Sequence, residues 1–394
     1  MSKIFGRKKI VKQIWKILEK ESILFVAERR IGKTTVLDQL RDNPHDDYIV
    51  IFSDVEGITT PLEFVKKIIQ SLSSHLNPKE KIVIEGWETI KELLGSMETN
   101  KIKFPRLKKN WKPLLEKALT IICAKSDKKV VFLWDEIPYM LQKIHQHEQK
   151  SAIVENNSLE ILDILRSLRK NNNNLRMIFT GSIGLHHILT EISHGISTEP
   201  LNDMKTVPLT PLTPSEAKEM VMYLLDEEDV IEIDDNSIDL IIKQCDRVPF
   251  YIKRMIERLG LQEHPINSVS IRQTLNEMIV DANDELEMEH FRSRLTDYYT
   301  GSETLENDSA LAHSDIAKQL LDIFAATETS LSIDECYQLI KTYFPINRDL
   351  LIKLLNDLAN DYYLCRNTDG SYYFCFTLLK QWWLKAQGLT GEEQ

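Results

Sequence analysis

The sequence predicts an α/β fold in which helices cover both faces of a parallel sheet. Short apolar runs, such as residues 23–26 and 130–134, are typical of buried parallel strands. They alternate with amphipathic segments of helical periodicity, such as residues 158–170. Strands that alternate with helices in this way form a parallel sheet, because each helix returns the chain to the end of the sheet where the strand began.

The composition is that of a soluble globular protein of two or three domains. The chain has 394 residues, of which 42% are apolar and 28% are charged. No apolar run approaches the ~18 residues of a membrane span, and the charged start, MSKIFGRKKIVKQIW, lacks the apolar core of a signal peptide. The net charge of −11 argues against broad, non-specific binding to nucleic acid. We therefore expect a cytoplasmic protein without a membrane partner.

The cysteines are scattered along the chain, odd in number and never spaced as CxxC. This usage fits a reducing cytoplasm and argues against both a zinc site and a disulfide framework. The five are Cys123, Cys245, Cys336, Cys365 and Cys375.

The stretch ILFVAERRIGKTTVLDQL, residues 23–40, predicts a strand, a phosphate-binding loop and a helix. The Walker A pattern asks for Gly, four residues, Gly, Lys and Ser or Thr, and here Ala27 replaces the first glycine but leaves the phosphate ligands intact. Backbone N–H groups at the start of the helix would surround the phosphates of ATP, while Lys33 reaches the outer phosphates and the Thr34 hydroxyl holds Mg²⁺. The residues expected to bind the nucleotide here are Arg29, Arg30, Ile31, Gly32, Lys33, Thr34 and Thr35.

The second half of the site is predicted in KKVVFLWDEIPYML. Its apolar run ends in Asp135 and Glu136, which is the pattern of a Walker B strand. Attack on a γ-phosphate needs one carboxylate for the Mg²⁺ shell and another to orient and polarise water. Asp135 suits the first task and Glu136 the second, because adjacent residues at a strand end serve different neighbours. The alternative is a strand followed by a helix-capping acid without catalysis, and Lys33 upstream argues against it.

A polar side chain is also expected at the tip of the neighbouring strand, within LRMIFTGSIGL. Such a side chain can sense the γ-phosphate or position the water, and we assign this role to Ser182, with Thr180 as the alternate. The alternative is that Thr180, Gly181 and Ser182 are only turn residues.

Further segments complete a P-loop NTPase core over residues 1–210. Strands are predicted at residues 48–56 and 204–212, and a helix over residues 112–125 leads to the Walker B strand. The lysine-rich segment before that helix is irregular in pattern, and we interpret it as an insertion over residues 76–110, with Trp87 buried.

Residues 211–300 predict a helical lid and a linker. Thr213 is expected to cap a helix, with Pro214 in its first turn and Glu216 completing a capping box. Arg294, in FRSRLTDYY, is a candidate arginine finger for a neighbouring subunit, and an intramolecular salt bridge is the alternative.

Residues 311–394 predict a winged-helix domain. Three helices are expected before a hairpin in YYLCRNTDGSYYFCF, whose turn falls at Asp369 and Gly370, and an apolar-faced helix follows in TLLKQWWLKA. Residues 315–387 carry seven Lys or Arg and nine Asp or Glu, a net charge of −2. This charge disfavours DNA as the partner of the domain.

The chain resembles AAA+-related P-loop ATPases, nearest to the archaeal-type and STAND-like ATPases of bacteria and archaea. The resemblance rests on ERRIGKTTVL, VVFLWDE and IFTGSIGL, and on IFGRKKIVKQI, PLTPSEAKEM, VPFYIKRM and FRSRLTDYY elsewhere in the chain. It implies that Phe5, Gly6 and Arg7 lie against the adenine and that Pro249 of the lid also approaches the base. Arg247 stands where the family has the glycine of its Gly-x-Pro motif. The resemblance further implies roles in stress or phage defence.

We expect an ATP-driven molecular switch that uses ATP and Mg²⁺. ATP would close the core against the lid and reposition the winged helix or a neighbouring subunit, and hydrolysis would reset it. The expected partner is another protein or a second copy of the chain. Two alternatives stay open: a DNA-handling ATPase of the origin-binding or transposition-regulator type, and a nucleotide-binding scaffold that barely hydrolyses ATP. Glu136 argues against the scaffold, and Ala27 argues in its favour.

Overall fold

The computed structural model describes residues 5–75, 111–124, 127–151, 156–181, 185–193, 200–228, 233–262, 265–304 and 310–389. The expected insertion, residues 76–110 with Trp87, lies outside this described part, and so does Ser182. Contacts within the chain divide it into two units. The core unit consists of Arg7–Arg29 and Lys33–Leu209, and the C-terminal unit of Met1–Gly6, Arg30–Gly32 and Thr210–Gln394.

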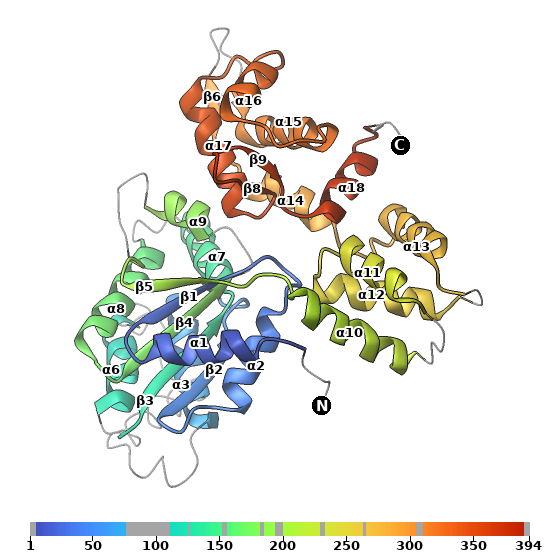
Figure 1. Ribbon diagram of the computed structural model, residues 1–394. Coiled ribbons are helices and arrows are strands. Elements are labelled where there is room, and N and C mark those ends of the chain that lie inside the picture. Colours follow the sequence, from blue (N-terminus) through green and yellow to red (C-terminus); the bar gives the residue numbers. More distant parts are fainter. Residues whose placement is uncertain are drawn as a thin grey trace. The chain divides into compact units, whose positions relative to one another are not determined.

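A five-stranded sheet forms the centre of the core unit (Figure 1). The strands are β1 (Ser22–Val26), β2 (Tyr48–Asp54), β3 (Lys129–Asp135), β4 (Leu175–Gly181) and β5 (Met204–Pro208). They lie in the order β2-β3-β4-β1-β5, and every neighbouring pair is parallel. This topology confirms the α/β class and the parallel sheet predicted from the sequence.

Helices lie on both faces of this sheet (Figure 1). On one face lie α1 (Lys8–Leu18) and α2 (Lys33–Asp42). The two helices contact each other, α1 contacts β1, and α2 contacts β2. A second layer contains α3 (Pro61–His75), α6 (Trp111–Ala124), α7 (Ile137–Lys150) and α8 (Asn157–Asn171), and α9 (Leu185–Ile192) packs against α7.

Strand β3, which lies between β2 and β4, explains why the acidic pair stands at the carboxyl end of the sheet. Its residues 130–134 are fully buried, as the continuous apolar run predicts. The ring of Trp134 lies 5.2 Å from those of Phe64 and Phe132 and 5.6 Å from that of Phe179. Each such buried aromatic side chain contributes about 1.5–3 kcal/mol of hydrophobic stabilisation. The core therefore fixes the strand firmly, and Asp135 follows where the strand leaves it.

Four helices begin the C-terminal unit: α10 (Pro214–Glu227), α11 (Asp235–Gln244), α12 (Pro249–Gly260) and α13 (Ser268–Val280). The capping box expected at α10 is present. Thr213 N–H donates to Glu216 Oε2 at 2.9 Å, and Glu216 N–H donates to Thr213 Oγ1 at 3.3 Å. Because both donors would otherwise lack an intrahelical partner, the box determines where the helix begins.

The rest of the unit contains the helices and the hairpin expected over residues 315–387, together with a helix and a pair of short strands that were not expected from the sequence. Its helices are α14 (Glu289–Tyr298), α15 (His313–Ala326), α16 (Ile333–Ile340), α17 (Arg348–Asn360) and α18 (Thr377–Ala386). Two short hairpins pair β6 (Ser302–Thr304) with β7 (Ala310–Ala312), and β8 (Leu364–Arg366) with β9 (Tyr372–Phe374). The second turns at Gly370, whose φ of 89° favours glycine, as predicted. Among the described residues, no helix combines the length and the hydropathy that crossing a membrane requires.

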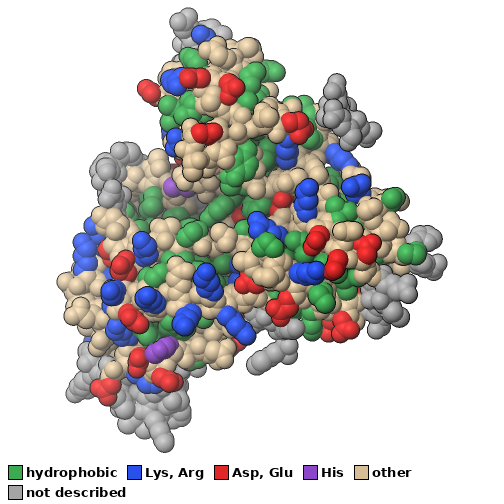
Figure 2. All heavy atoms as spheres, in the orientation of Figure 1, with side chains coloured by type: hydrophobic (Ala, Val, Ile, Leu, Met, Phe, Trp, Pro, Cys, Tyr) green, Lys and Arg blue, Asp and Glu red, His purple; other side chains and the backbone are tan. Residues whose placement is uncertain are grey.

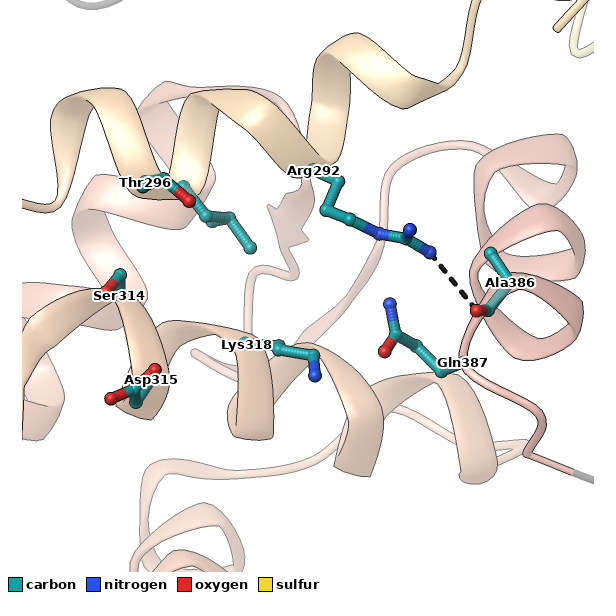
Figure 3. A pocket seen from close by; sticks show the side chains of 8 residues that line it. Arg292, Thr296, Ser314, Asp315, Lys318, Ala386 and Gln387 are labelled. Atoms are coloured by element: carbon teal, nitrogen blue, oxygen red, sulfur yellow. Dashed lines mark hydrogen bonds between the residues drawn. The ribbon is translucent and has the colours of Figure 1, made fainter.

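Both ends of α18 are held by other elements of the same unit. At its start, Asp246 Oδ2 accepts a hydrogen bond of 2.8 Å from Leu378 N–H. At its end, Arg292 Nη2 donates to the carbonyl oxygen of Ala386 at 3.1 Å, beside a cavity of about 310 Å³ that Lys318 and Gln387 also line (Figure 3). A carboxylate at a helix start and a guanidinium at a helix end both complement the helix dipole.

The hairpin β8–β9 contradicts the expectation that no cysteine is disulfide-bonded. Cys365 and Cys375 form a disulfide, with their Cα atoms 4.9 Å apart. Their spacing shows no CxxC pattern, because the hairpin brings together residues that are ten positions apart in the sequence. Cys123, Cys245 and Cys336 are free and buried. Cysteine usage therefore no longer supports a reducing compartment, and the cytoplasmic location stays a prediction.

Candidate active site

The loop that joins β1 to α2 has a backbone suited to phosphate binding. Arg30 and Gly32 take positive φ angles of 68° and 102°, so the chain turns tightly before α2 begins at Lys33. The first N–H groups of a helix have no intrahelical partner and can bind phosphate oxygens. Ala27 is buried and is not among the described residues with positive φ. Its methyl group therefore brings no backbone strain to the position where the motif has glycine.

Lys33 is buried and lies close to Glu136, which follows β3. Its side chain is 8% exposed, and Nζ lies 3.9 Å from Glu136 Oε1 and 3.5 Å from the carbonyl oxygen of Ala27. Burial lowers the pKa of Lys33, whereas the negative charges of Glu136, Asp135 and Glu28 raise it. An ammonium group held in this way is placed to exchange carboxylate partners for the oxygens of a phosphate chain.

The two adjacent acids at the end of β3 have different partners. Thr180 Oγ1, at the end of β4, donates a hydrogen bond to Asp135 Oδ1. Glu136 takes a left-handed conformation, φ 61° and ψ 40°, and stands at the N-cap of α7 with its carboxylate beside Lys33. The separation of tasks expected for these two carboxylates is therefore compatible with their geometry.

The carboxylates around Asp135 fit a Mg²⁺ ion. Burial raises the pKa of the Asp135 carboxyl, and Glu136 and Asp54 act in the same direction, while Thr180 and Lys33 lower it. Asp54 ends β2 in register with Asp135, so negative charge gathers at the ends of two neighbouring strands. Carboxylate and hydroxyl oxygens are the ligands that Mg²⁺ prefers. Asp135, with the exposed Thr34 at the start of α2, would hold the ion.

The tip of β4 presents Thr180, the alternate sequence candidate, to Asp135. Ser182, the first choice, lies outside the described residues. Gly181, between them, is packed so closely that a Cβ atom there would lie 2.3 Å from Cγ of Pro138. This close packing of the tip of β4 against the start of α7 holds the acidic pair in a defined position.

Sequence reasoning missed two residues of this site, Tyr139 and Glu28. Arg29 Nη2 donates to the hydroxyl of Tyr139 at 2.6 Å, and Arg29 N–H donates to Glu28 Oε1 at 2.7 Å. Glu28 is only 2% exposed. Tyr139 lies in the first turn of α7, three residues after Glu136, and this place directly behind the acidic pair is the signal that could have found it.

Other residues expected to bind the nucleotide belong to the C-terminal unit. The ring of Phe5 lies 5.1 Å from that of Tyr223. Pro249 is the first residue of α12 and follows Arg247, whose φ is 61°, so the arginine takes the left-handed conformation that glycine favours. Three more of these residues belong to the same unit. Gly6 has a φ of 62°, and Ile31 is buried. The guanidinium of Arg30 lies 4.2 Å from the ring centroid of Phe250, and Arg30 pairs with Glu287. Their contact with the nucleotide stays a prediction.

Two further residues expected to bind the nucleotide, Arg7 and Thr35, lie in the core unit. Arg7 takes a φ of 66° at the N-cap of α1 and is 7% exposed. Thr35 is half-buried in the first turn of α2. The role of Arg7 at the adenine likewise stays a prediction.

The structure contradicts the prediction that Arg294 is an arginine finger. Arg294 is 3% exposed, and its Nη2 donates to the carbonyl oxygen of Asp361 at 2.9 Å. Its guanidinium lies 4.7 Å from the ring centroid of Phe291 and 4.8 Å from that of Tyr363. A side chain enclosed within the C-terminal unit cannot reach a neighbouring subunit. The alternative, an intramolecular salt bridge, agrees better with the structure, because the contacts are intramolecular. The partners are a carbonyl group and aromatic rings in place of a carboxylate.

Arg294→Ala is therefore expected to destabilise the protein and to leave catalysis intact. The loss of a buried charged hydrogen bond and of two ring contacts should cost about 3 kcal/mol of unfolding free energy. Thermal and urea unfolding measure this loss, with the exposed Arg272→Ala on α13 as the control. An unchanged stability combined with lost turnover would restore the arginine finger.

The comparisons with known proteins agree with this architecture. Residues 17–189 match the family model described as AAA domain, a range that contains Lys33, Asp135 and Glu136. The fold is similar to that of the Walker-type ATPase PABY2304 of Pyrococcus abyssi, with 17% sequence identity, 96% of each chain covered and a TM-score of 0.59. No curated protein matches the sequence.

Two further solved structures are more distant. The ADP form of the ORC2 protein of Aeropyrum pernix has 9% identity and a TM-score of 0.46, covering 99% of this chain and 96% of its own. Cdc6p of Pyrobaculum aerophilum has 10% identity and a TM-score of 0.41, covering 98% and 96%. The family match and the likeness to the Pyrococcus ATPase lead to one conclusion: this chain has the P-loop NTPase fold, and its residues 17–189 are similar to the AAA domain.

Proposed function

We propose that the chain binds MgATP at this site, hydrolyses it, and uses the nucleotide state to control a protein partner or its own assembly. The observation that carries the proposal is the meeting of Lys33, Asp135 and Glu136 at the ends of β1 and β3. Lys33 Nζ lies 3.9 Å from Glu136 Oε1, and Thr180 orients Asp135. A phosphate-binding cation, a ligand for Mg²⁺ and a base are the groups that phosphoryl transfer to water requires.

Each side chain has a task that its position supports. Lys33 would bind the β- and γ-phosphate oxygens together with the N–H groups at the start of α2. Thr34 and Asp135 would hold Mg²⁺, which supplies charge neutralisation on the phosphates when bound. Glu136 would orient the attacking water and accept its proton. Thr180 holds the Asp135 carboxylate in place through their hydrogen bond.

The C-terminal unit would convert this chemistry into a change of shape. We assign residues 211–300 to a lid and a linker, and residues 311–394 to a winged helix. The order of α15–α17, the hairpin β8–β9 and α18 supports the second assignment. Asp246, just before α12, binds the start of α18, so a movement of the lid would be passed to the winged helix. A role in stress or phage defence is part of the same hypothesis, through resemblance alone.

A protein surface suits the winged helix better than DNA does. Residues 315–387 carry a net charge of −2, and acidic and basic groups are intermixed over these elements at the top of Figure 2. Helix α17, in the place of a recognition helix, buries a leucine face, and its Arg348 lies 2.5 Å from Asp334. Few cations thus remain for phosphates.

The switch is tested by comparing the full-length Glu136→Gln variant with MgATP, with MgADP and without nucleotide. We expect MgATP to change either the molecular mass or the radius of gyration, measured by light scattering and small-angle X-ray scattering. Identical values in all three samples would contradict the switch. A fourth sample contains mixed-sequence duplex DNA at about 150 mM salt, where non-specific binders still reach roughly 10⁻⁴–10⁻⁶ M. Micromolar binding there would favour the DNA-handling alternative.

A further inference from the structure

Arg29 brings a guanidinium group to the proposed active site from within the phosphate loop. It is the third residue after β1, and its side chain is half-buried. Its Nη2 donates to the Tyr139 hydroxyl at 2.6 Å, and its Cζ lies 5.7 Å from the centroid of that ring. The side chain is therefore held against the first turn of α7.

The same turn carries the proposed base. Glu136 is the N-cap of α7 and Tyr139 lies in the first turn of that helix, so Arg29 is held within one turn of the proposed base. Lys33 Nζ lies 3.9 Å from Glu136 Oε1. Lys33 Nζ also lies 3.5 Å from the carbonyl oxygen of Ala27, two residues before Arg29. Separate contacts thus hold Lys33 and Arg29 at the start of α7.

The other arginines described in the core unit contact other residues or lie in other elements. Arg41 pairs with Asp38 and Asp42 on α2, and Arg169 pairs with Asp203. Arg176 donates to the carbonyl oxygens of Leu18 and Leu175, Arg166 donates to Asn202, and Arg7 begins α1. Arg294 is enclosed in the C-terminal unit. Among the arginines described in the core unit, Arg29 is therefore the one whose side chain binds the first turn of α7, which follows the acidic pair.

We propose that Arg29 is a catalytic arginine supplied in cis, whose guanidinium contacts the γ-phosphate oxygens during hydrolysis. The inference rests on the proposed ATPase function. The water oxygen forms a bond to the γ-phosphorus, the bond from that phosphorus to the β,γ-bridging oxygen breaks, and ADP leaves with that electron pair. Glu136 accepts the proton of the water. During this exchange negative charge is spread over the three equatorial oxygens, and the planar guanidinium is suited to bind two of them.

The hydrogen bond to Tyr139 suits an arginine that moves by a short distance. A phenol hydroxyl is a neutral acceptor that takes one bond from Arg29, whereas a phosphate carries negative charge and accepts two parallel N–H···O bonds from a guanidinium. The guanidinium would therefore leave Tyr139 for a γ-phosphate and return when phosphate has left. The hydroxyl holds the side chain near the site meanwhile, so little conformational entropy is lost on binding.

The test compares full-length wild type with Arg29→Ala and with Arg41→Gln as the matched control on α2. Turnover is measured as phosphate release, and binding by calorimetry with MgADP alone and with MgADP plus aluminium fluoride, which mimics the transferring phosphoryl group. We expect Arg29→Ala to lower kcat by about 10³-fold. MgADP should bind as in wild type, but the tightening caused by aluminium fluoride should be lost. Arg41→Gln should resemble wild type in every measurement.

Chemical rescue separates a catalytic role from a structural one. Free guanidinium ion at millimolar concentration should restore part of the turnover of Arg29→Ala and none of that of Glu136→Gln. Wild-type kcat and wild-type aluminium fluoride binding in Arg29→Ala would overturn the inference and leave the ATPase function standing. A wild-type protein without turnover would instead overturn the proposed function, and this inference with it.

Discussion

Glu136→Gln is expected to abolish turnover while MgATP binding persists. The amide keeps the size of the side chain but cannot accept the proton of the attacking water. A general base contributes about 10²–10⁴-fold to such a reaction, and we expect kcat to fall by that amount. Lys33 Nζ keeps its contact with the carbonyl oxygen of Ala27, at 3.5 Å, so we expect the ammonium to remain available for phosphates.

Phosphate release at saturating MgATP measures this effect. Glu21→Gln is the matched control, because Glu21 is exposed and immediately precedes β1. A wild type that releases phosphate no faster than Glu136→Gln would contradict hydrolysis at this site. The nucleotide-binding scaffold would then be the better description.

The parts of this site that local patterns encode could be predicted from the sequence. A buried parallel strand needs a continuous apolar run, so residues 130–134 predicted β3 and positioned the acidic pair at its end. The Walker A spacing likewise predicted a loop that ends where α2 begins, at Lys33. In both cases the signal and the structure extend over fewer than about ten residues, the length of one short element.

Contacts between distant segments carried no such signal. Arg29 and Tyr139 are 110 residues apart, and only the pairing of strands between them brings the two side chains together. Spacing rules apply within one element, so they do not find this pair. The cysteines of the β8–β9 hairpin are only ten positions apart, and the predicted turn at Asp369 and Gly370 was the signal that could have paired them.

Arg294 was misread although a local signal existed. Phe291, Leu295 and Tyr298 repeat at helical spacing and form the buried face of α14. Arg294 lies on that same face, which predicts enclosure more strongly than its charge predicts exposure. Buried arginines occur where a carbonyl group and aromatic rings satisfy the guanidinium.

Lys33→Ala is expected to weaken nucleotide binding more than any other single change. The substitution removes the ammonium that would face the β- and γ-phosphates, leaving their charge without its nearest buried cation. Such a loss costs on the order of 3 kcal/mol or more, which raises Kd by more than about 100-fold. The same truncation leaves Glu136 and Asp135 without the positive charge that lies beside them, so the thermal stability of the variant must be recorded as well.

Calorimetric titration of the full chain with Mg²⁺ and a slowly hydrolysed ATP analogue tests the proposed site most directly. Wild type, Lys33→Ala and the exposed-site control Lys20→Ala are compared at equal concentration and at a temperature where all three are folded. We predict one site per chain in wild type and in Lys20→Ala, with Kd more than about 100-fold higher in Lys33→Ala. Equal affinity in Lys33→Ala and wild type would contradict the account, because it would show that the nucleotide binds without the phosphate loop.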